Sequence, residues 1–331
     1  MVINLAQLPR QPLGFLPTPL VELKRLSRFL NGPRIWIKRD DVTGLAFGGN
    51  KTRKLEFLVG DALAQGADTL VTGGAAQSNH CRQTAAAAAM CGLECHLALG
   101  GTAPQIANGN LLLDGLLGAH IHWSGELRKG ENIPQIVAQL KAAGKTPYVV
   151  PYGGSSKVGA IGYADAMCEL GTQLAEVGEK ISHMVFASSS GGTHAGLLIG
   201  RQIFGSTCQI IGIQIEKESA GEQSLEQIIS TLVHEAAADL GMEIRISEKD
   251  LSLRADYVGG GYGVVGALER EAISLLATHE GILLDPVYTG RAMGGLIDLI
   301  RRGEFARHDN VLFWHTGGGP ALFAYAQQLN T

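Results

Sequence analysis

A lysine at position 51 stands where the sequence changes from a glycine-rich turn to an amphipathic helix. Residues 48–50, Gly-Gly-Asn, precede it, and apolar side chains recur at helical spacing after it. A lysine amine that is desolvated or crowded by another cation becomes nucleophilic and can form a Schiff base with a carbonyl cofactor such as pyridoxal phosphate. Arg53 and Lys54 are expected to supply that crowding. The alternative is an ordinary helix start with solvated lysines.

A run of small residues at 188–194, Ser-Ser-Ser-Gly-Gly-Thr-His, lies between an apolar segment and a predicted helix. Such a turn exposes backbone N–H groups and hydroxyls at the positive end of a helix, where phosphate binds well. The run lacks the lysine of a Walker A loop. An ordinary strand-to-helix turn would use similar residue types. The residues predicted to hold a phosphate are Ser189, Ser190, Gly191, Gly192 and Thr193.

The sequence Gln-Ser-Asn at 77–79 also follows an apolar segment and opens a predicted helix. Ser78 and Asn79 would present a hydroxyl, an amide and backbone donors at the helix N-terminus, which suits a substrate carboxylate. Serine and asparagine also favour simple N-caps. For this stretch taken alone, the N-cap is the favoured interpretation.

Two tyrosines stand beside turns. Tyr262 lies between glycines, and Tyr288 follows Asp-Pro-Val at the end of a predicted strand. Ligands in α/β sheets bind at the carboxyl ends of strands, and a tyrosine there can exchange a proton with a leaving group if a nearby cation lowers its pKa. The alternative is a tyrosine of the core or of the pocket rim.

A further glycine cluster imitates a dinucleotide-binding fingerprint. Residues 261–266 read Gly-Tyr-Gly-Val-Val-Gly, and Asp285 follows about 20 residues later, as a ribose-binding acid would. The segment 254–258 before it is charged and makes a poor buried strand, and a proline follows Asp285. A nucleotide-dependent oxidoreductase therefore stays as an alternative from another class, and a non-catalytic ligand-binding protein as a third.

Three histidines fall in the candidate loops, namely His80, His194 and His315. They lack the i, i+4 partner or the carboxylate spacing that a metal site requires. We expect them to form polar walls, and no metal is predicted.

Composition bounds the class of protein. The 331 residues are 45% hydrophobic and carry a net charge of −4, which allows a full core and offers no basic face to nucleic acid or anionic lipid. No apolar run approaches the roughly 18–20 residues of a membrane span. Five cysteines without a Cys-x-x-Cys pair fit a reducing compartment. Residues 1–11 lack the apolar core of a signal peptide, so we expect a cytoplasmic protein.

The elements that must position these side chains alternate along the chain. Short apolar runs are separated by helical segments of about 10–15 residues, which favours parallel sheets joined by crossover helices. A short helix is predicted at 21–30, and longer helices include 77–90, 159–177 and 264–279. The predicted strands are 35–38, 68–72, 95–99, 120–123, 148–151, 184–187, 209–215, 282–285 and 310–314.

Taken together, these stretches resemble the pyridoxal-phosphate enzymes of the tryptophan-synthase-β structural class, fold type II. More narrowly, the chain resembles the family of D-cysteine desulfhydrase and 1-aminocyclopropane-1-carboxylate (ACC) deaminase. The similarity runs nearly end to end, and its specificity lies in an ordered set of motifs. These are 37–41, 48–56, 77–79, 191–193, 285–288 and 315–318.

The resemblance implies a two-domain, three-layer α/β fold with parallel sheets and the cofactor in the cleft. The smaller domain would span 52–155, and a larger pyridoxal-phosphate-binding domain would combine 1–51 with 156–331. It also implies a homodimer that closes on a small amino-acid substrate.

The resemblance also assigns roles to individual residues. Asn50 and Asn79 would hydrogen-bond the phenolic oxygen of the cofactor, and Lys54 would join the serine-glycine loop at its phosphate. Ser78 would take the substrate carboxylate, with Gln77 and Asn79 nearby. The implied catalytic residues are Lys51 as the Schiff-base lysine, Ser78, Tyr262 and Tyr288.

Two positions separate the branches of this family. ACC deaminases carry a glutamate after the motif tyrosine and a leucine after the motif histidine, whereas this chain has Thr289 and Thr316, as in the desulfhydrases. A carboxylate near the pyridine nitrogen keeps it protonated and strongly electron-withdrawing, whereas a threonine hydroxyl leaves it neutral. Opening a cyclopropane ring is expected to need the stronger electron sink, whereas expelling a thiol from Cβ needs less. The alternative is that both threonines merely line the cofactor.

The implied reaction is the α,β-elimination of D-cysteine with water to pyruvate, ammonia and hydrogen sulfide. L-Cysteate sulfo-lyase and ACC deaminase activities are the alternatives that keep the cofactor. The sequence leaves the choice between D and L substrates open.

Overall fold

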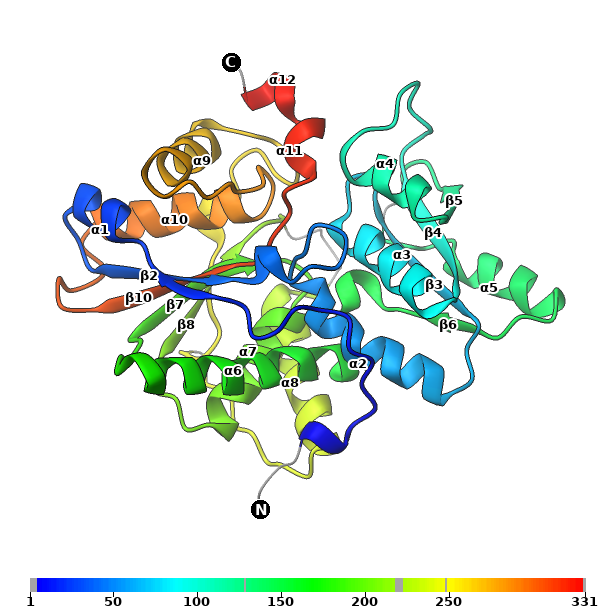
Figure 1. Ribbon diagram of the computed structural model, residues 1–331, viewed down its shortest axis with the longest axis horizontal. Helices are drawn as coiled ribbons and strands as arrows, with labels where there is room; N and C mark the ends of the chain where they lie inside the picture. Colours follow the sequence, from blue (N-terminus) through cyan, green and yellow to red (C-terminus); the bar gives the residue numbers. More distant parts are fainter. Residues whose placement is uncertain (1–4, 128, 218–222, 248, 330–331) are drawn as a thin grey trace.

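Two separate β-sheets, each covered by helices, organise the chain (Figure 1). The computed structural model describes residues 5–127, 129–217, 223–247 and 249–329. The alternation of short apolar runs with helices therefore produces parallel sheets with helical layers, as predicted. The exact division into 52–155 and the remainder stays a prediction.

The larger sheet has six strands in the order β1-β2-β10-β7-β8-β9. All neighbouring strands run parallel except β1 and β2, which are antiparallel. The strands are β1 (Leu20–Glu22), β2 (Arg34–Arg39), β7 (His183–Ser188), β8 (Gln209–Gln214), β9 (Ser252–Arg254) and β10 (Asn310–His315).

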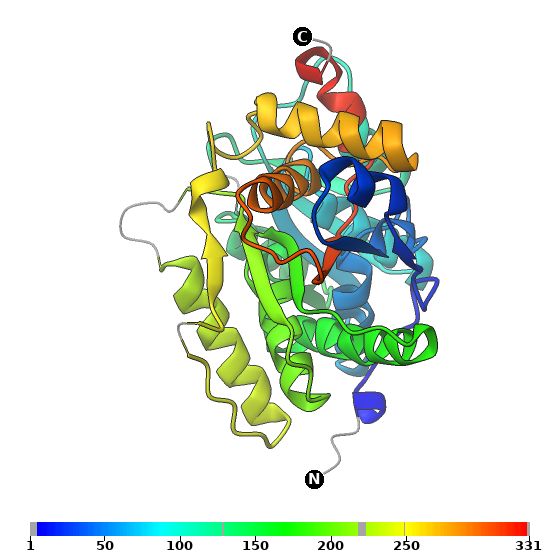
Figure 2. The same ribbon diagram turned by 90° about the vertical axis from the view of Figure 1, so that its left-hand side faces the viewer.

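Alternate side chains of β10 point to opposite faces of the larger sheet, as the pleat of a strand requires. Val311 and Phe313 pack with one helix layer, and Leu312 and Trp314 pack with the other. Figure 2 shows the sheet between these layers. The first layer holds α1 (Lys24–Leu30), α9 (Ala267–Glu280) and α10 (Thr289–Arg301), and the second holds α6 (Lys157–Val177), α7 (Gly192–Ile203) and α8 (Leu225–Asp239).

The smaller sheet has four parallel strands in the order β5-β4-β3-β6. Leu70 packs in a core with α2, α3 and α4, whereas Val71 faces α5 on the other side. The strands are β3 (Thr69–Ala75), β4 (Glu94–Gly100), β5 (His120–Trp123) and β6 (Pro147–Val149). The helices are α2 (Lys51–Ala64), α3 (Asn79–Cys91), α4 (Gly109–Leu116) and α5 (Ile133–Ala142).

Short helical turns complete the described chain. Two lie at its C-terminal end, α11 (Ala321–Ala324) and α12 (Ala326–Leu329). The 3-10 helices are Leu5–Gln7, Asp40–Val42, Tyr152–Gly154 and Ala255–Tyr257. The absence of a signal peptide was predicted from residues 1–11. Of these, residues 1–4 lie outside the described residues.

The predicted strand at 282–285 is wrong. Its first three side chains alternate between buried and exposed, which is the pattern of a strand, but its backbone bonds to side chains instead of a neighbouring strand. The Asp285 N–H donates to Thr289 Oγ1 at 2.8 Å, and the Leu283 carbonyl lies 2.9 Å from His315 Nε2. The segment is therefore an extended connection that packs on the sheet without joining it.

The predicted helix at 21–30 is wrong over its first residues. Leu20–Glu22 pairs antiparallel with β2, and helix α1 begins only at Lys24. Backbone pairing with an existing strand outweighs the local helical pattern here, because tertiary contacts commonly override weak local propensity.

A buried polar network ties α2 to the larger sheet. Both oxygens of Asp40 accept from Arg53, at 2.9 Å each, and one also accepts from Tyr163 Oη and Trp314 Nε1 at 2.7 Å. Arg53 also pairs with Glu169 of α6 at 2.9 Å. Burial alone would raise the pKa of Asp40, but Arg53 and the hydrogen-bond donors hold it below its usual value. The network fixes the helix that begins at Lys51.

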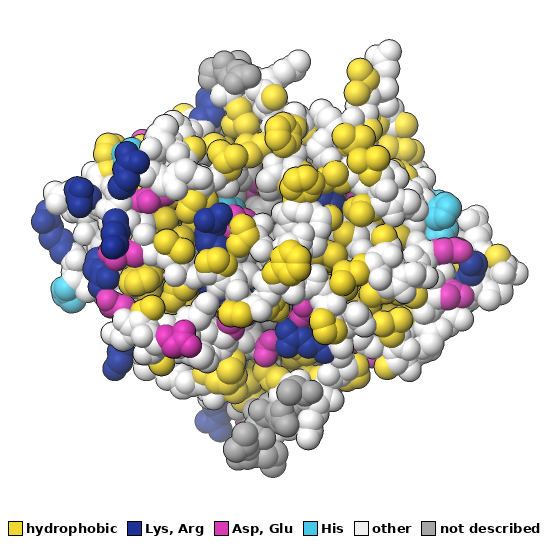
Figure 3. Space-filling model, viewed as in Figure 1, with side chains coloured by type: hydrophobic (Ala, Val, Ile, Leu, Met, Phe, Trp, Pro, Cys, Tyr) yellow, Lys and Arg dark blue, Asp and Glu magenta, His cyan; other side chains and the backbone are white. Residues whose placement is uncertain are grey.

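The surface mixes charge signs where basic residues gather. Figure 3 shows basic side chains lying among acidic ones at the α1 end of one face. There Arg34 pairs with Glu22 at 3.2 Å and with Glu179 at 2.7 Å. Among the described residues, none of the helices combines the length and the apolarity needed to span a bilayer.

Candidate active site

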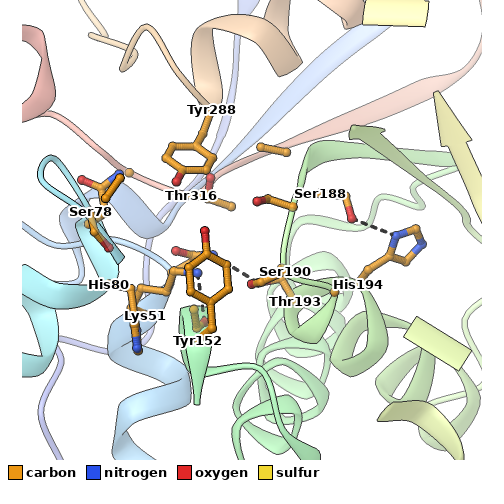
Figure 4. Close-up of a pocket in the computed structure, with 18 of the residues that line it drawn as sticks. Lys51, Ser78, His80, Tyr152, Ser188, Ser190, Thr193, His194, Tyr288 and Thr316 are labelled. Atoms are coloured by element: carbon orange, nitrogen blue, oxygen red, sulfur yellow. Dashed lines mark hydrogen bonds between the residues drawn. The ribbon is translucent and has the colours of Figure 1, made fainter. Parts of the chain in front are cut away.

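One pocket collects most of the residues singled out by the sequence (Figure 4). It lies where β3 ends at Ala75, β7 at Ser188 and β10 at His315, so both sheets contribute to it. This agrees with the rule that ligands of parallel sheets bind beyond the carboxyl ends of strands. The predicted site residues that line it are Asn50, Lys51, Ser78, Asn79, Ser189, Ser190, Gly191, Thr193, Tyr262, Tyr288 and Thr316.

Lys51 is the first residue of α2 and extends its amine into this pocket (Figure 4). Nζ donates to the Gly153 carbonyl at 3.0 Å. Desolvation lowers the pKa of the Lys51 amine to about 8, so much more of it is neutral near physiological pH than for an ordinary lysine. The expectation that Arg53 crowds this amine is wrong, because Arg53 is turned into the Asp40 network. Burial is what makes the lysine nucleophilic.

Lys54, one helical turn later, is 1% exposed and lies beside the pocket-lining residues. Its Nζ donates to Gly153 O at 3.2 Å and to Ser155 Oγ at 3.4 Å. Burial, followed by the proximity of Lys51, lowers its pKa well below the usual value. Within the described part of the chain, no carboxylate pairs with Lys51 or Lys54, so the pair lacks an anionic partner.

The serine-glycine loop forms a cup next to these lysines. Ser155 Oγ lies 2.8 Å from Ser190 Oγ and accepts from the Gly192 N–H at 3.0 Å. Gly191, with φ +82°, turns the chain into α7, whose N-terminus points at the pocket. A Cβ on Gly192 would lie 2.6 Å from Ser155 Oγ and 3.0 Å from Lys54 Nζ, so only glycine fits. A phosphate fits this cup, because it would supply the negative charge that the buried lysines lack.

Asn50 joins the lysine segment to the cup. Its amide Nδ2 donates to Thr193 Oγ1 at 3.1 Å. On the other side, Ser78 is the N-cap of α3 and accepts from Cys81 N at 3.2 Å while it lines the pocket. The capping and the ligand-facing interpretations of Ser78 are therefore compatible.

Four of the predicted residues lie outside the pocket lining. Lys54 and Gly192 belong to the cup described above, whereas Gln77 and Thr289 bond elsewhere. Gln77 turns toward α4, where its Nε2 donates to Asn108 O at 3.1 Å and its Oε1 accepts from the Asn110 N–H at 2.9 Å. Thr289 is fully buried behind the pocket, and its Oγ1 donates to Asp285 Oδ1 at 2.7 Å. Of the two threonines, only Thr316 reaches the lining.

Tyr262 and Tyr288 meet in the pocket, with their hydroxyl oxygens 2.8 Å apart and their ring centroids 5.9 Å apart. The condition that a nearby cation lowers their pKa is not met. Burial is the largest cause and raises the pKa of both phenols; contact with Tyr262 raises that of Tyr288 further. Both tyrosines therefore favour the protonated form, and one hydroxyl of the pair donates to the other.

Several lining residues were missed as site residues. None of them was assigned a ligand: His80 and His194 were expected only to form polar walls, and Ser188 only to begin the serine-glycine run. Tyr152 stands in front of Lys51 and below Tyr288 in Figure 4. The lining residues not predicted to bind a ligand are Ala75, His80, Tyr152, Gly153, Ala187, Ser188, His194 and Gly317.

The three candidate-loop histidines have different positions. His80 and His194 line the pocket, and His315 bonds toward Leu283 instead. Burial lowers the pKa of His194 to about 3 and that of His80 well below its usual value. Both rings are therefore neutral, which suits a polar wall.

The glycine cluster at 261–266 does not have the context of a dinucleotide fingerprint. A 3-10 helix, Ala255–Tyr257, separates it from β9, whereas the fingerprint requires a strand that runs directly into the turn. Asp285 Oδ2 accepts from the backbone N–H groups of Val287 and Tyr288 at 2.9 Å, so this carboxylate caps a turn.

Two helix-covered sheets, whose strands end at a pocket with a desolvated lysine and an anion cup, are typical of the pyridoxal-phosphate-dependent enzymes of fold type II. The chain belongs to the pyridoxal-phosphate dependent enzyme family, whose model matches residues 12–317. It is 46% identical over 332 residues to D-cysteine desulfhydrase from Salmonella choleraesuis (strain SC-B67), covering 97% of this chain and 98% of that protein.

Solved structures agree with this assignment. A crystal structure of an ACC deaminase homologue is 39% identical, has a TM-score of 0.90, and covers 98% of this chain and 97% of its own. Threonine deaminase isoform 2 from Solanum lycopersicum, at 16% identity, has a TM-score of 0.67 and covers 99% of this chain and 86% of its own. The second likeness shows the fold alone. Pyridoxal phosphate is thus the cofactor of this protein.

Proposed function

We propose that this protein is a carbon-sulfur lyase that converts D-cysteine and water to pyruvate, ammonia and hydrogen sulfide. The observation that carries the proposal is one pocket lined both by a desolvated lysine amine and by two tyrosines whose hydroxyls are hydrogen-bonded to each other. Relatives named D-cysteine desulfhydrase, at 46–47% identity over nearly the whole chain, support it.

Residues of both sheets would hold the cofactor. Lys51 would bind its aldehyde, Lys54 and the loop 189–193 its phosphate, and Asn50 and Asn79 its phenolic oxygen. Bound in this way, pyridoxal phosphate supplies an electron sink that stabilises the negative charge left on Cα when its proton is removed.

The side chains of the pocket perform the proton transfers. The Lys51 amine, with its pKa lowered to about 8, is the base that takes the Cα proton. Ser78 and the N-terminus of α3 hold the substrate carboxylate. Tyr288, protonated and bonded to Tyr262, donates a hydrogen bond to the sulfur as its bond to Cβ breaks. Water then hydrolyses the released enamine to pyruvate and ammonia.

The polarity of the lining favours elimination of a thiol over opening of a cyclopropane ring. Thr316 supplies a hydroxyl, and among the described residues that line the pocket none is acidic. A pyridine nitrogen beside a hydroxyl stays neutral and forms a weaker sink, which is sufficient for a good leaving group.

A substrate panel tests the proposal. We expect the cofactor-loaded protein to form pyruvate from D-cysteine and β-chloro-D-alanine, with little product from L-cysteine, L-cysteate or ACC. Pyruvate and 2-oxobutyrate are measured directly, and a nicotinamide cofactor is included in a parallel reaction. Turnover of ACC alone would refute the argument from Thr316, and absence of any turnover would favour a binding protein.

Tyr288→Phe is expected to lower kcat for D-cysteine about 10- to 100-fold and to change KM less than about threefold. The phenol stays protonated and bonds the leaving sulfur only as the Cβ–S bond breaks. Tyr262→Phe keeps the Tyr288 hydroxyl and should lose less. Steady-state kinetics of both variants are compared; a change confined to KM would contradict the role of proton donor.

We also propose that the protein is a cytoplasmic homodimer. Within each chain, the pocket would lie between a smaller domain of residues 52–155 and a larger domain that combines 1–51 with 156–331. The five cysteines are all unpaired, which suits a reducing compartment. The dimeric state is implied by the family resemblance, and light scattering of the purified protein measures its mass in solution.

A further inference from the structure

A buried asparagine outside the pocket holds one of the pocket residues. Asn110 lies in the first turn of α4, which packs against α3 (Figure 1), and it is 0% exposed. Its Nδ2 donates to the Gln77 carbonyl at 2.9 Å and to Asn79 Oδ1 at 2.9 Å. Asn110 itself does not line the pocket, but Asn79 does.

These two bonds determine which way the Asn79 amide points. A backbone carbonyl can only accept, so the Asn110 group that faces Gln77 O must be its NH2. The same NH2 then faces Asn79, and the Asn79 atom that meets it must be the oxygen. The opposite orientation of Asn110 would set two acceptors against each other. Consistent with this, Asn110 Oδ1 has no hydrogen-bond partner among the described residues.

With its oxygen occupied by Asn110, Asn79 has its NH2 left for the pocket. An NH2 group stabilises an anionic oxygen, whereas a carbonyl oxygen would repel it. We propose that Asn110 is a positioning residue that presents Asn79 to the cofactor as a donor. This inference rests on the proposed function, in which Asn79 bonds the phenolic oxygen of the cofactor.

The test is a set of four single variants and one double variant, each loaded with pyridoxal phosphate. Asn110→Ala frees the Asn79 amide to rotate, and Asn110→Asp places an acceptor against the Asn79 oxygen. We expect Asn110→Ala to lower kcat about tenfold, Asn110→Asp to lower it further, and both to shift the pH midpoint of the visible absorbance of the bound cofactor. Asn108→Ala is the control, because it removes a bond to Gln77 without touching Asn79.

The fourth variant, Asn79→Ala, separates positioning from a merely structural role. If Asn110 acts through Asn79, then Asn110→Ala will change neither kcat nor the absorbance midpoint further when Asn79 is already alanine. An equal loss in both backgrounds would overturn the proposal. So would a drop in the thermal midpoint of the cofactor-free protein that accounts for the loss of activity.

The absorbance titration is measured without substrate, so its result does not depend on which amino acid the enzyme consumes. If Asn79→Ala leaves the titration unchanged, the role of Asn79 itself fails, and the proposal for Asn110 fails with it. If the titration responds as expected but D-cysteine is not consumed, the positioning role stands and only the proposed substrate is wrong.

Discussion

Lys51→Ala is expected to lower turnover of D-cysteine by at least about a thousandfold and to abolish covalent attachment of the cofactor. The Lys51 amine serves both as the attachment point and as the base at Cα, and the neighbouring Lys54 amine is already bonded to Gly153 and Ser155 at the phosphate cup. Borohydride reduction of the native protein, followed by peptide mapping, should place the label on Lys51.

Lys51→Arg is the matched control, because it keeps a positive charge but has no nucleophilic amine at neutral pH. It should be as inactive as Lys51→Ala. Since the pKa of Lys51 is lowered to about 8, cofactor uptake by the stripped native protein should accelerate as the pH rises through 8, when the neutral amine becomes dominant. Label on another lysine, or uptake that slows over this range, would contradict the assignment.

Asp40→Asn is expected to destabilise the protein by about 3–5 kcal/mol. The substitution removes the negative charge of Asp40 and leaves the buried guanidinium of Arg53 with Glu169 as its anionic partner. It also removes an acceptor oxygen that Tyr163 and Trp314 share with Arg53. The pKa of Asp40 is lowered in the fold, so its contribution is present above the usual carboxyl pKa and disappears as the pH falls below it. Urea unfolding of the cofactor-free protein measures the change.

Asp239→Asn is the control for this experiment. Asp239 pairs with Lys157 at 2.9 Å, but both side chains are about half exposed, at 52% and 48%. Surface pairs of this kind contribute about 0–1 kcal/mol, so the unfolding midpoint should barely move. Equal effects of the two substitutions would show that the buried network around Asp40 contributes no more to the free energy of unfolding than a surface ion pair does.

The sequence was sufficient for the elements and the chemistry that depend on local patterns. The glycines before Lys51 predict a turn into a helix, the serine-glycine loop at 188–194 predicts a tight strand-to-helix turn, and the structure brings both to one pocket. Short apolar runs predicted the parallel sheets. These signals are local, because turn chemistry and strand burial depend on neighbouring residues.

The sequence failed where a side chain or strand had more than one available partner. Gln77 bonds to α4 instead of a substrate, and Thr289 bonds to Asp285 behind the pocket. The segment 282–285 begins with burial that alternates like a strand, but its polar backbone atoms bond to side chains. The pKa shifts of the tyrosines were also beyond reach, because they depend on burial and on the contact between Tyr262 and Tyr288, which only the fold brings together.

One hydroxyl joins the two halves of the molecule. Ser155, which follows the smaller sheet, contacts Ser190 and caps the N–H of Gly192 in the loop that follows β7 of the larger one. The anion cup is consequently built from both halves of the molecule, and it is complete only while the two sheets keep their relative position. Supply of the coenzyme therefore affects the stability of the fold. Without the coenzyme's phosphate, the junction between the two sheets lacks its anionic partner, and saturation with the coenzyme raises resistance to unfolding through mass action.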